Sequence, residues 1–272
     1  MIYLGLIGYP VKHSVSPSMH NAALKFLGIE GIYMAFEVKP NDLVKAIEGA
    51  KALGFLGLNV TIPYKEEVAK LVKTVGDAAK INTVNVLDLK NSIGYNTDVF
   101  GVEESFRREN IDVEGKVALV VGAGGAGKAS ALAMLKMGAK VVVTNRTVLR
   151  GLETVEMLRN FGECIFIPFD EINKVKGRVD IIINATPIGM LGFESSLPIP
   201  GDLVEKDLIV FDTVYNPPET PLIKLAKERG CKVVSGVEML IYQGAKALEI
   251  WLKVDAPVEV MRRAVLKELG LK

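Results

Sequence analysis

The segment VVGAGGAGKASA, residues 120–131, constrains the fold more than any other part of the sequence. It places Gly122, Gly124 and Gly127 in a G-x-G-x-x-G pattern, between the strand-like run KVALVVG and an alanine-rich run typical of a helix. The first glycine permits a tight turn, the second lets backbone N–H groups approach a pyrophosphate, and the third lets helix and strand pack closely. The sequence therefore predicts a dinucleotide-binding turn, with the N-terminus of the helix facing the anion.

Strand-like and helix-like segments alternate along the chain, which predicts an α/β fold with mostly parallel sheets. A Rossmann-type doubly wound parallel sheet has six strands, and the chain has six short β-branched runs from Val117 on: KVALVVG, KVVVTN, CIFIPF, VDIIINA, DLIVFD and CKVVSG. Earlier in the chain we expect strands at IYLGLIG, IYMAFEV, FLGLNVTI and NTVNVL, and helices that begin near Ser16, Pro40 and Lys65.

A chain of 272 residues is long enough for two domains. We expect an N-terminal α/β substrate domain at residues 1–101 and a Rossmann domain at residues 102–235. Residues 236–272 read as helices, and their apolar spacing alone leaves open whether they complete the second domain or return to the first.

The composition argues against several classes of partner. With 33 basic and 32 acidic side chains, the chain has no charge excess that would suit nucleic acid. No apolar run approaches the roughly 20 residues that span a bilayer, and the amino end lacks the features of a signal peptide, so a cytoplasmic protein is expected. His13 and His20 have no cysteine or acid at ligand spacing, so no metal is expected. Cys164 and Cys231 are expected to be reduced core thiols.

The end of the second strand of the Rossmann domain favours NADP over NAD. An NAD-binding domain usually carries an acid about 20 residues after the glycine loop, and this chain has Asn145, Arg146 and Thr147 there. The planar guanidinium of Arg146 suits a 2′-phosphate, and Arg150 lies one helical turn further along. Alternatively, Asn145 or Thr147 caps the helix that follows.

The stretch NVTIPYK, residues 59–65, combines a polar and an apolar face. If it is a strand, Asn59 and Thr61 share one face and Val60 and Ile62 the other. Its proline should end the strand, so that Lys65 begins the next helix near the carboxyl edge of the sheet, where open α/β sheets bind ligands. The alternative is an edge strand with a solvated lysine.

A dinucleotide without a metal implies hydride transfer, which needs a substrate carbonyl and a proton donor to its oxygen. Hydroxyls, amides, one lysine and one acid in the first hundred residues suit a small polyhydroxylated molecule. These candidates are Ser14, Ser16, Asn59, Thr61, Lys65, Asn82, Asn96, Thr97 and Asp98. Ser16 and Asp98 also suit helix N-termini, and that role can coexist with binding.

Taken together and in order, the motifs resemble those of the shikimate dehydrogenase family of NADP-dependent enzymes. The matching motifs cover the chain from end to end: S-x-S-P-x-x-H-N at 14–21, N-V-T-x-P-x-K at 59–65, N-T from Asn82, N-T-D-x-x-G at 96–101, G-A-G-G-A from Gly122, N-R-T from Asn145, A-T-P-x-G-M from Ala185, D-x-x-Y-x-P-x-x-T-x-L at 212–222 and M-L-x-x-Q-G at 239–244.

The resemblance implies a role for each matching residue. Ser14 and Ser16 would hold the substrate carboxylate, with Tyr215 nearby, and Lys65 and Asp98 would be catalytic. The ring hydroxyls would contact Asn59, Thr61, Asn82, Asp98 and Gln243, which places Gln243 on a helix that returns to the first domain. The cofactor would contact Gly122, Ala123, Gly124, Gly125, Ala126, Gly127, Asn145, Arg146, Thr147, Arg150, Thr186, Met190, Val214, Gly236 and Met239, the last five on the nicotinamide side.

The resemblance also implies the reaction, which is reversible NADPH-dependent reduction of 3-dehydroshikimate to shikimate in aromatic amino acid (chorismate) biosynthesis. One alternative is a quinate/shikimate dehydrogenase of relaxed specificity. Another is a non-catalytic dinucleotide-binding sensor, which would be expected to lose Lys65 or Asp98. The sequence leaves open whether Lys65 donates the proton or mainly orients and polarises the substrate, and whether the protein is a homodimer.

Overall fold

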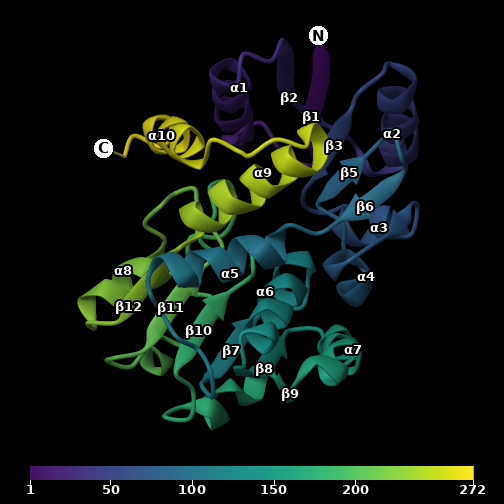
Figure 1. The fold of residues 1–272 in the computed structure, drawn as a ribbon. Coiled ribbons are helices and arrows are strands. Elements are labelled where there is room, and N and C mark those ends of the chain that lie inside the picture. The colour runs from purple at the N-terminus through teal and green to yellow at the C-terminus, as the bar shows by residue number, and fades with distance from the viewer. Residues whose placement is uncertain (272) are drawn as a thin grey trace. The chain divides into compact units, whose positions relative to one another are not determined.

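Each of two units of the chain is built on its own six-stranded sheet (Figure 1). The computed structural model describes residues 1–271. The first unit contains residues 1–97 and the chain from Ile241 on, and the second contains residues 98–240. The chain from Ile241 on therefore belongs to the first unit, whereas residues 236–240 belong to the second. Among the residues described, no helix is both long and apolar enough to cross a membrane.

The first unit has a mixed sheet with the strand order β2-β1-β3-β5-β6-β4. Its strands are β1 (Ile2–Gly8), β2 (Gly31–Glu37), β3 (Gly57–Val60), β4 (Lys73–Thr74), β5 (Val86–Asp88) and β6 (Ile93–Tyr95). Strands β2, β1 and β3 are parallel, whereas β5 runs antiparallel to β3 and to β6. Each of the four strands expected here has a counterpart, but β3 covers only part of its run and β5 begins at Val86, late in the run NTVNVL. The short strands β4 and β6 were not predicted.

The helices of the first unit are α1 (Ser16–Phe26), α2 (Leu43–Ala52), α3 (Lys65–Ala69), α4 (Asp77–Ile81) and α10 (Val258–Glu268). The predicted starts of α1 and α3 are confirmed, and Pro40 begins a 3₁₀ turn, Pro40–Asp42, that leads into α2. Proline is well suited to these helix starts, because the first turn of a helix has no use for its missing N–H. Helix α10 packs against α1.

The tryptophan of α9 (Gly236–Leu252) fastens this helix to the sheet of the first unit. Trp251 Nε1 donates to the carbonyl oxygen of Leu87, on β5, at 2.9 Å. A Cβ atom on Gly57, in β3, would lie 2.0 Å from the same indole nitrogen. Glycine at this position is therefore required by the close approach of the indole to the strand.

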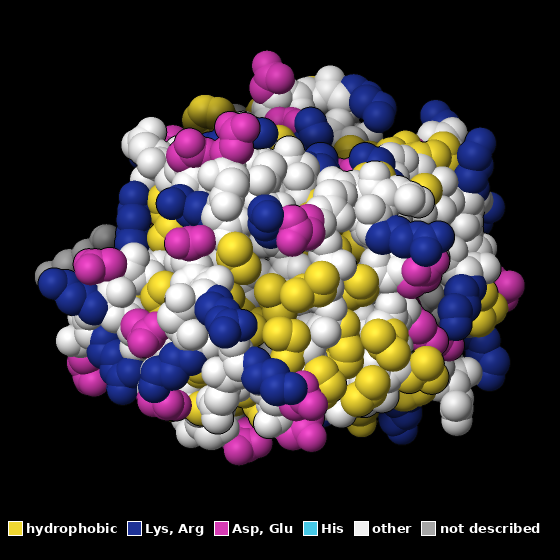
Figure 2. Space-filling view, turned by 90° about the horizontal axis from the view of Figure 1, so that it is seen from below, with side chains coloured by type: hydrophobic (Ala, Val, Ile, Leu, Met, Phe, Trp, Pro, Cys, Tyr) yellow, Lys and Arg dark blue, Asp and Glu magenta, His cyan; other side chains and the backbone are white. Residues whose placement is uncertain are grey.

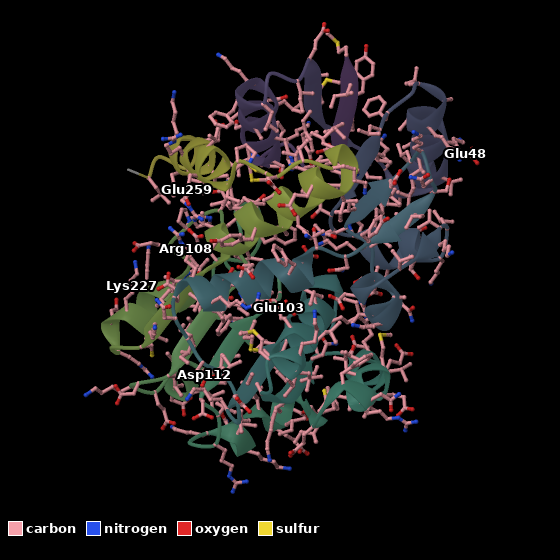
Figure 3. All side chains as sticks on the ribbon, viewed as in Figure 1. Glu48, Glu103, Arg108, Asp112, Lys227 and Glu259 are labelled. Atoms are coloured by element: carbon pink, nitrogen blue, oxygen red, sulfur yellow. The ribbon has the colours of Figure 1, made fainter. Side chains whose placement is uncertain are left out.

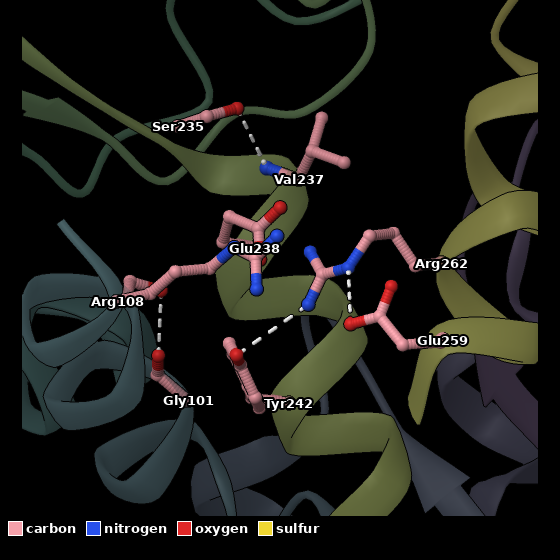
Figure 4. Close-up of polar contacts among 9 residues, drawn as sticks. Gly101, Arg108, Ser235, Val237, Glu238, Tyr242, Glu259 and Arg262 are labelled. Carbon is pink, nitrogen blue, oxygen red and sulfur yellow. Dashed lines mark hydrogen bonds and ion pairs between the residues drawn. The ribbon is translucent and has the colours of Figure 1, made fainter. Parts of the chain in front are cut away.

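Arg262 of α10, which pairs with Glu259 on its own helix, ties α10 to the part of α9 in the first unit through Tyr242. Arg262 is only 6% exposed, and its Nε donates to Glu259 Oε1 at 3.2 Å. The guanidinium also lies 5.5 Å from the ring centroid of Tyr242 and donates to its hydroxyl at 3.4 Å (Figure 4). A buried arginine is tolerated because its charge meets a carboxylate and an aromatic face.

The second unit is a fully parallel sheet with the order β12-β11-β10-β7-β8-β9. All six predicted runs are strands: β7 (Val117–Val121), β8 (Lys140–Asn145), β9 (Cys164–Pro168), β10 (Ile181–Asn184), β11 (Ile209–Asp212) and β12 (Lys232–Ser235). Counted along the chain, this is the 3-2-1-4-5-6 order of the Rossmann fold, so the predicted fold class is confirmed. The order reverses between β7 and β10, and ligands bind such sheets at this point.

The helices of the second unit are α5 (Asp98–Arg108), α6 (Gly125–Lys136), α7 (Val148–Leu158), α8 (Pro221–Glu228) and the first residues of α9. Glu103, labelled in Figure 3, lies on α5. It pairs with Lys136 Nζ on α6 at 2.6 Å. Positive and negative side chains are interspersed on the face shown in Figure 2. This mixture matches the balanced composition and presents no single-sign surface there.

We predict that Gly57→Ala destabilises the protein by about 1–3 kcal/mol, because the added methyl group overlaps the indole of Trp251. Urea denaturation followed by circular dichroism measures the change. Gly49→Ala is the matched control: a Cβ there meets nothing within 4 Å, and alanine in the middle of α2 should stabilise by about 0.5–1 kcal/mol. An unchanged midpoint for Gly57→Ala would contradict the prediction.

Candidate functional site

The glycine loop of the second unit has the geometry that its motif predicts. Gly122 has a φ of +110°, and a Cβ there would lie 2.8 Å from the carbonyl oxygen of Ala185. A Cβ on Gly127 would lie 1.9 Å from the carbonyl oxygen of Gly122, so only glycine lets α6 begin this close to β7. A Cβ on Gly124 would meet nothing within 4 Å. Open space at this glycine, beside the N-terminus of α6, fits the pyrophosphate of a dinucleotide.

Asn145, the last residue of β8, fastens the glycine loop to the turn that follows β8. Its Oδ1 accepts the N–H of Ala123 at 3.2 Å, and its Nδ2 donates to the carbonyl oxygen of Thr147 at 2.9 Å. Thr147 takes the N-cap position of α7 without a side-chain cap hydrogen bond. No side-chain hydrogen bond therefore supports the alternative in which Thr147 caps α7. Arg146 and Arg150 are exposed, where their guanidinium groups suit a 2′-phosphate.

The loops after β10 and β11 carry the residues expected on the nicotinamide side. Thr186 follows β10, and its hydroxyl donates to Asn184 Oδ1 at 2.7 Å. The N–H of Val214, after β11, donates to Asp212 Oδ1 at 3.0 Å. A Cβ on Gly236 would lie 2.5 Å from the carbonyl oxygen of Asp212, so the start of α9 lies directly against this loop. Met190 and Met239 also lie in this unit, and Met239 is buried.

In the first unit, the two serines expected to hold the substrate carboxylate are adjacent at the start of α1. The N–H of Ser16 donates to Ser14 Oγ at 3.3 Å. Ser16 is the first residue of α1, the residue before it is Val15, and no side chain caps the helix. Ser16 is therefore not an N-cap, and the N-terminus of α1 favours an anion electrostatically. His13 is exposed beside this turn.

A chain of hydrogen-bonded amides lies at the carboxyl end of β3 and just before the start of β5. Asn59, 5% exposed, accepts from Tyr33 Oη at 2.7 Å and donates from Nδ2 to the carbonyl oxygen of Asn85 at 3.0 Å. Asn85 Oδ1 accepts the N–H of Thr97 at 2.7 Å. Its Nδ2 donates to Gln243 Oε1 at 3.2 Å. Gln243 thus joins the predicted substrate residues from the far end of the chain.

Asn82, which the resemblance assigns to the substrate ring hydroxyls, lies apart from the buried amide chain. Asn82 is exposed at the end of α4, with a φ of +48°. Asn85, three residues later, is only 2% exposed, and its amide contacts Thr97 and Gln243. Sequence reasoning missed Asn85, although its place at the start of a strand beside Asn59 was a usable signal, because neighbouring strands place such residues side by side.

Lys65 begins α3 and is half-buried, and its carbonyl oxygen accepts the N–H of Val84. Tyr64, fully buried, donates its hydroxyl to the carbonyl oxygen of Val38 and so anchors the start of the helix. Strand β3 ends at Val60, earlier than expected. Ile62 therefore lies outside the strand and is 39% exposed, so its expected place on the core face was wrong.

The other site candidates have distinct surroundings. Asp98, 3% exposed, is the first residue of α5, where the N-terminus of the helix stabilises a carboxylate. Tyr215 is half-buried, and both residues belong to the second unit. Thr61 is half-buried after β3, and its N–H donates to the carbonyl oxygen of Ile7.

Among the residues described, no group of three or more histidine, cysteine or acidic side chains could hold a metal ion.

Comparison with known proteins gives matches along the whole chain. The model of the shikimate dehydrogenase substrate binding domain matches residues 6–87. The shikimate/quinate 5-dehydrogenase model matches residues 104–190, and the shikimate 5′-dehydrogenase C-terminal domain matches residues 236–266.

Individual relatives cover nearly the full length. The shikimate dehydrogenase (NADP⁺) of Archaeoglobus fulgidus is 60% identical over 269 residues, which is 99% of each chain. A crystal structure of a shikimate dehydrogenase in complex with NADP⁺ is 38% identical, with a TM-score of 0.89 over 99% of this chain and 96% of that chain. A quinate dehydrogenase of Corynebacterium glutamicum in complex with NAD is 30% identical, with a TM-score of 0.88 over 98% of this chain and 99% of that chain. The glycine loop, the amide chain and these matches lead to one conclusion: the chain belongs to the shikimate dehydrogenase family.

Proposed function

We propose that this protein is an NADP-dependent shikimate dehydrogenase, which reversibly reduces 3-dehydroshikimate to shikimate in aromatic amino acid biosynthesis. The observation that carries the proposal is the amide chain, in which Asn85 and Gln243, 158 positions apart, meet beside Asn59. Buried amides with both donors and acceptors suit the hydroxyl groups of a small ring. We further propose a cytoplasmic location, as expected of a biosynthetic enzyme that uses NADPH.

Reduction of the substrate carbonyl needs a hydride donor and a proton donor. NADPH, when bound, supplies the hydride to the carbonyl carbon of the substrate. Negative charge then builds on the carbonyl oxygen, and the ammonium group of Lys65 stabilises this charge and supplies the proton. In the reverse direction, where the substrate carries a hydroxyl at the reacting carbon, Asp98 accepts a hydrogen bond from that hydroxyl and fixes its direction. Ser14 and Ser16, at the N-terminus of α1, hold the substrate carboxylate.

On the cofactor side, three groups of residues in the second unit each bind one part of the dinucleotide. The glycine loop and the start of α6 hold the pyrophosphate, since a Cβ on Gly124 would meet nothing within 4 Å and the N-terminus of a helix favours an anion. Arg146 and Arg150 hold the 2′-phosphate, with Asn145 fixing the turn on which Arg146 lies. Thr186, Met190, Val214, Gly236 and Met239 line the nicotinamide.

The decisive assay follows NADPH absorbance with 3-dehydroshikimate, and repeats it with NADH and, in the reverse direction, with quinate. Strong preference for NADPH and shikimate supports the proposal. Comparable turnover of quinate would indicate relaxed specificity. NADP⁺ binding without any turnover would overturn the proposed reaction and leave a non-catalytic sensor.

We predict that Lys65→Ala lowers kcat by about 10²–10⁴, because the reaction loses its proton donor. The KM for 3-dehydroshikimate should change much less than kcat. Lys70→Ala, which changes an exposed lysine at the other end of the same helix, serves as the control and should keep wild-type turnover. If kcat of Lys65→Ala stays within fivefold of the wild type, Lys65 is not the proton donor.

We predict that Arg146→Gln raises the KM for NADPH about 10- to 100-fold and leaves the KM for NADH nearly unchanged, because only NADPH carries the 2′-phosphate. Steady-state kinetics with both cofactors give the two ratios. Arg159→Gln, at the far end of α7, is the control, because Arg159 pairs with Glu156 on the surface. An equal rise for both cofactors would contradict this role of Arg146.

We predict that Asn85→Ala lowers kcat/KM for 3-dehydroshikimate about tenfold or more, because it removes the partner of Gln243 and Thr97. Asn110→Gly is the control: glycine accepts the positive φ at this exposed position, and activity should stay near that of the wild type. A loss of activity in Asn110→Gly as large as in Asn85→Ala would contradict this role of Asn85. Thermal unfolding of both variants separates a binding effect from loss of the fold.

A further inference from the structure

A buried carboxylate in the second unit has no part in the proposed reaction. Asp212, the last residue of β11, is 1% exposed. Its Oδ2 accepts the hydroxyl of Thr220 at 2.7 Å, and its Oδ1 accepts Asn184 Nδ2 at 2.9 Å and the N–H of Val214 at 3.0 Å. Burial raises the pKa of Asp212 to about 6, and the three hydrogen bonds oppose this rise.

Asn184, the last residue of β10, is the second centre of the same network. Its Oδ1 accepts the N–H of Thr186 at 3.0 Å and the hydroxyl of Thr186 at 2.7 Å. Its Nδ2 donates to Asp212 and to the carbonyl oxygen of Ile188, at 3.2 Å. Since the N–H of Thr186 can only donate, the orientation of the Asn184 amide is fixed.

These hydrogen bonds join the two loops that follow β10 and β11. The N–H of Thr213 donates to the carbonyl oxygen of Asn184 at 3.0 Å, and the N–H of Leu191 donates to that of Asn216 at 2.9 Å. A Cβ on Gly189 would lie 3.3 Å from the Cβ of Thr220. The two loops therefore form one hydrogen-bonded body, centred on three side chains that are almost fully buried: Asn184, Asp212 and Thr220.

The network also reaches the glycine loop. The N–H of Ala185 donates to the carbonyl oxygen of Val121 at 2.9 Å. The Cβ position of Gly122 lies 2.8 Å from the carbonyl oxygen of Ala185 and 3.1 Å from the methyl carbon of Thr186. The loop after β10 therefore packs directly against the first glycine of the glycine loop.

Stability alone is a weak reason for such a network. A buried carboxylate costs free energy, and apolar residues of similar volume often stabilise a protein as well or better. The network lies at the carboxyl ends of β10 and β11, next to the point where strand order reverses and where ligands bind. Fully satisfied buried polar groups hold loops in one arrangement, which apolar packing does less well.

We infer that Asp212 is a positioning residue, which acts with Asn184 and Thr220 to fix the two loops that receive the nicotinamide end of the cofactor. The inference rests on the proposed function, because the nicotinamide roles of Thr186, Met190 and Val214 belong to it. Asp212 itself accepts hydrogen bonds only from the protein, so it acts through the loops.

The test uses variants at Thr220 in the full-length protein. Thr220→Val keeps the volume and removes the hydroxyl that Asp212 and the N–H of Ile223 share. Thr220→Ser keeps that hydroxyl. Thr144→Val is the matched control, because Thr144 is also fully buried and its hydroxyl has no hydrogen-bond partner. Calorimetric titration with NADP⁺ and with adenosine 2′,5′-bisphosphate, kcat with shikimate, and the unfolding temperature are measured for each.

We expect Thr220→Val to lower kcat or to raise the Kd of NADP⁺ about tenfold or more, the size expected for the loss of a hydrogen bond to a charged group. Binding of adenosine 2′,5′-bisphosphate should stay within twofold, because this ligand lacks the nicotinamide. Thr220→Ser and Thr144→Val should behave as the wild type. Asp212→Asn, which keeps the shape but puts an N–H₂ group opposite Thr220, should show the same pattern and replaces Thr220→Val if that variant fails to fold.

Unchanged kcat and Kd for NADP⁺ in Thr220→Val would overturn the inference. Equal loss of both ligands would also overturn it, because that result marks a general role in stability. If the wild-type protein binds neither ligand, the proposed function fails and this inference fails with it, whereas wild-type turnover with unaffected variants removes only the inference.

Discussion

A buried amide must meet both donors and acceptors, and this constraint determines the arrangement of the first unit around Asn85. The N–H of Thr97 fixes Asn85 Oδ1, so that Nδ2 can only face Thr97 Oγ1 and Gln243 Oε1. This places α9 where its glutamine reaches the sheet. The same helix is held at its far end by Trp251, whose indole donates to β5 and lies against Gly57. Two hydrogen bonds and one glycine thus align the C-terminal segment with the N-terminal sheet.

The interior of the first unit also contains a polar group without a partner. Both ring nitrogens of His20 are buried without a hydrogen bond, and burial lowers the pKa of His20 to about 3. Its ring stacks on Tyr33, with centroids 4.2 Å apart, and the hydroxyl of Tyr33 donates to Asn59. A Cβ on Gly244 would lie 3.4 Å from His20 Nε2 and 2.2 Å from the side chain of Met19. The neutral histidine therefore acts as an aromatic spacer between α1, β2 and α9.

Sequence patterns predicted the second unit better than the first, for a physical reason. Parallel strands buried on both faces read as continuous β-branched runs, and each of β7 to β12 has such a run. Strands β4 and β6 have only Lys73–Thr74 and Ile93–Tyr95, too short to show a period. The motif N-T drew attention to Asn82, whereas the contact of Asn59 with the carbonyl oxygen of Asn85 is set by strand pairing, which a linear motif does not record. Asp212 and Asn184 were missed as a pair because their hydrogen bond joins neighbouring strands that are separated by an entire crossover.

Both units use the same device to orient a polar side chain at a strand end. Asn85 in the first unit and Asn184 in the second are each locked by a backbone N–H that donates to Oδ1, from Thr97 and Thr186 respectively. In each case Nδ2 then donates to another side chain, Gln243 or Asp212. A backbone donor cannot exchange roles as a hydroxyl or an amide can, so it fixes the direction of the whole chain of hydrogen bonds. Side chains that face a ligand can therefore keep one orientation before the ligand arrives, which lowers the entropy lost on binding.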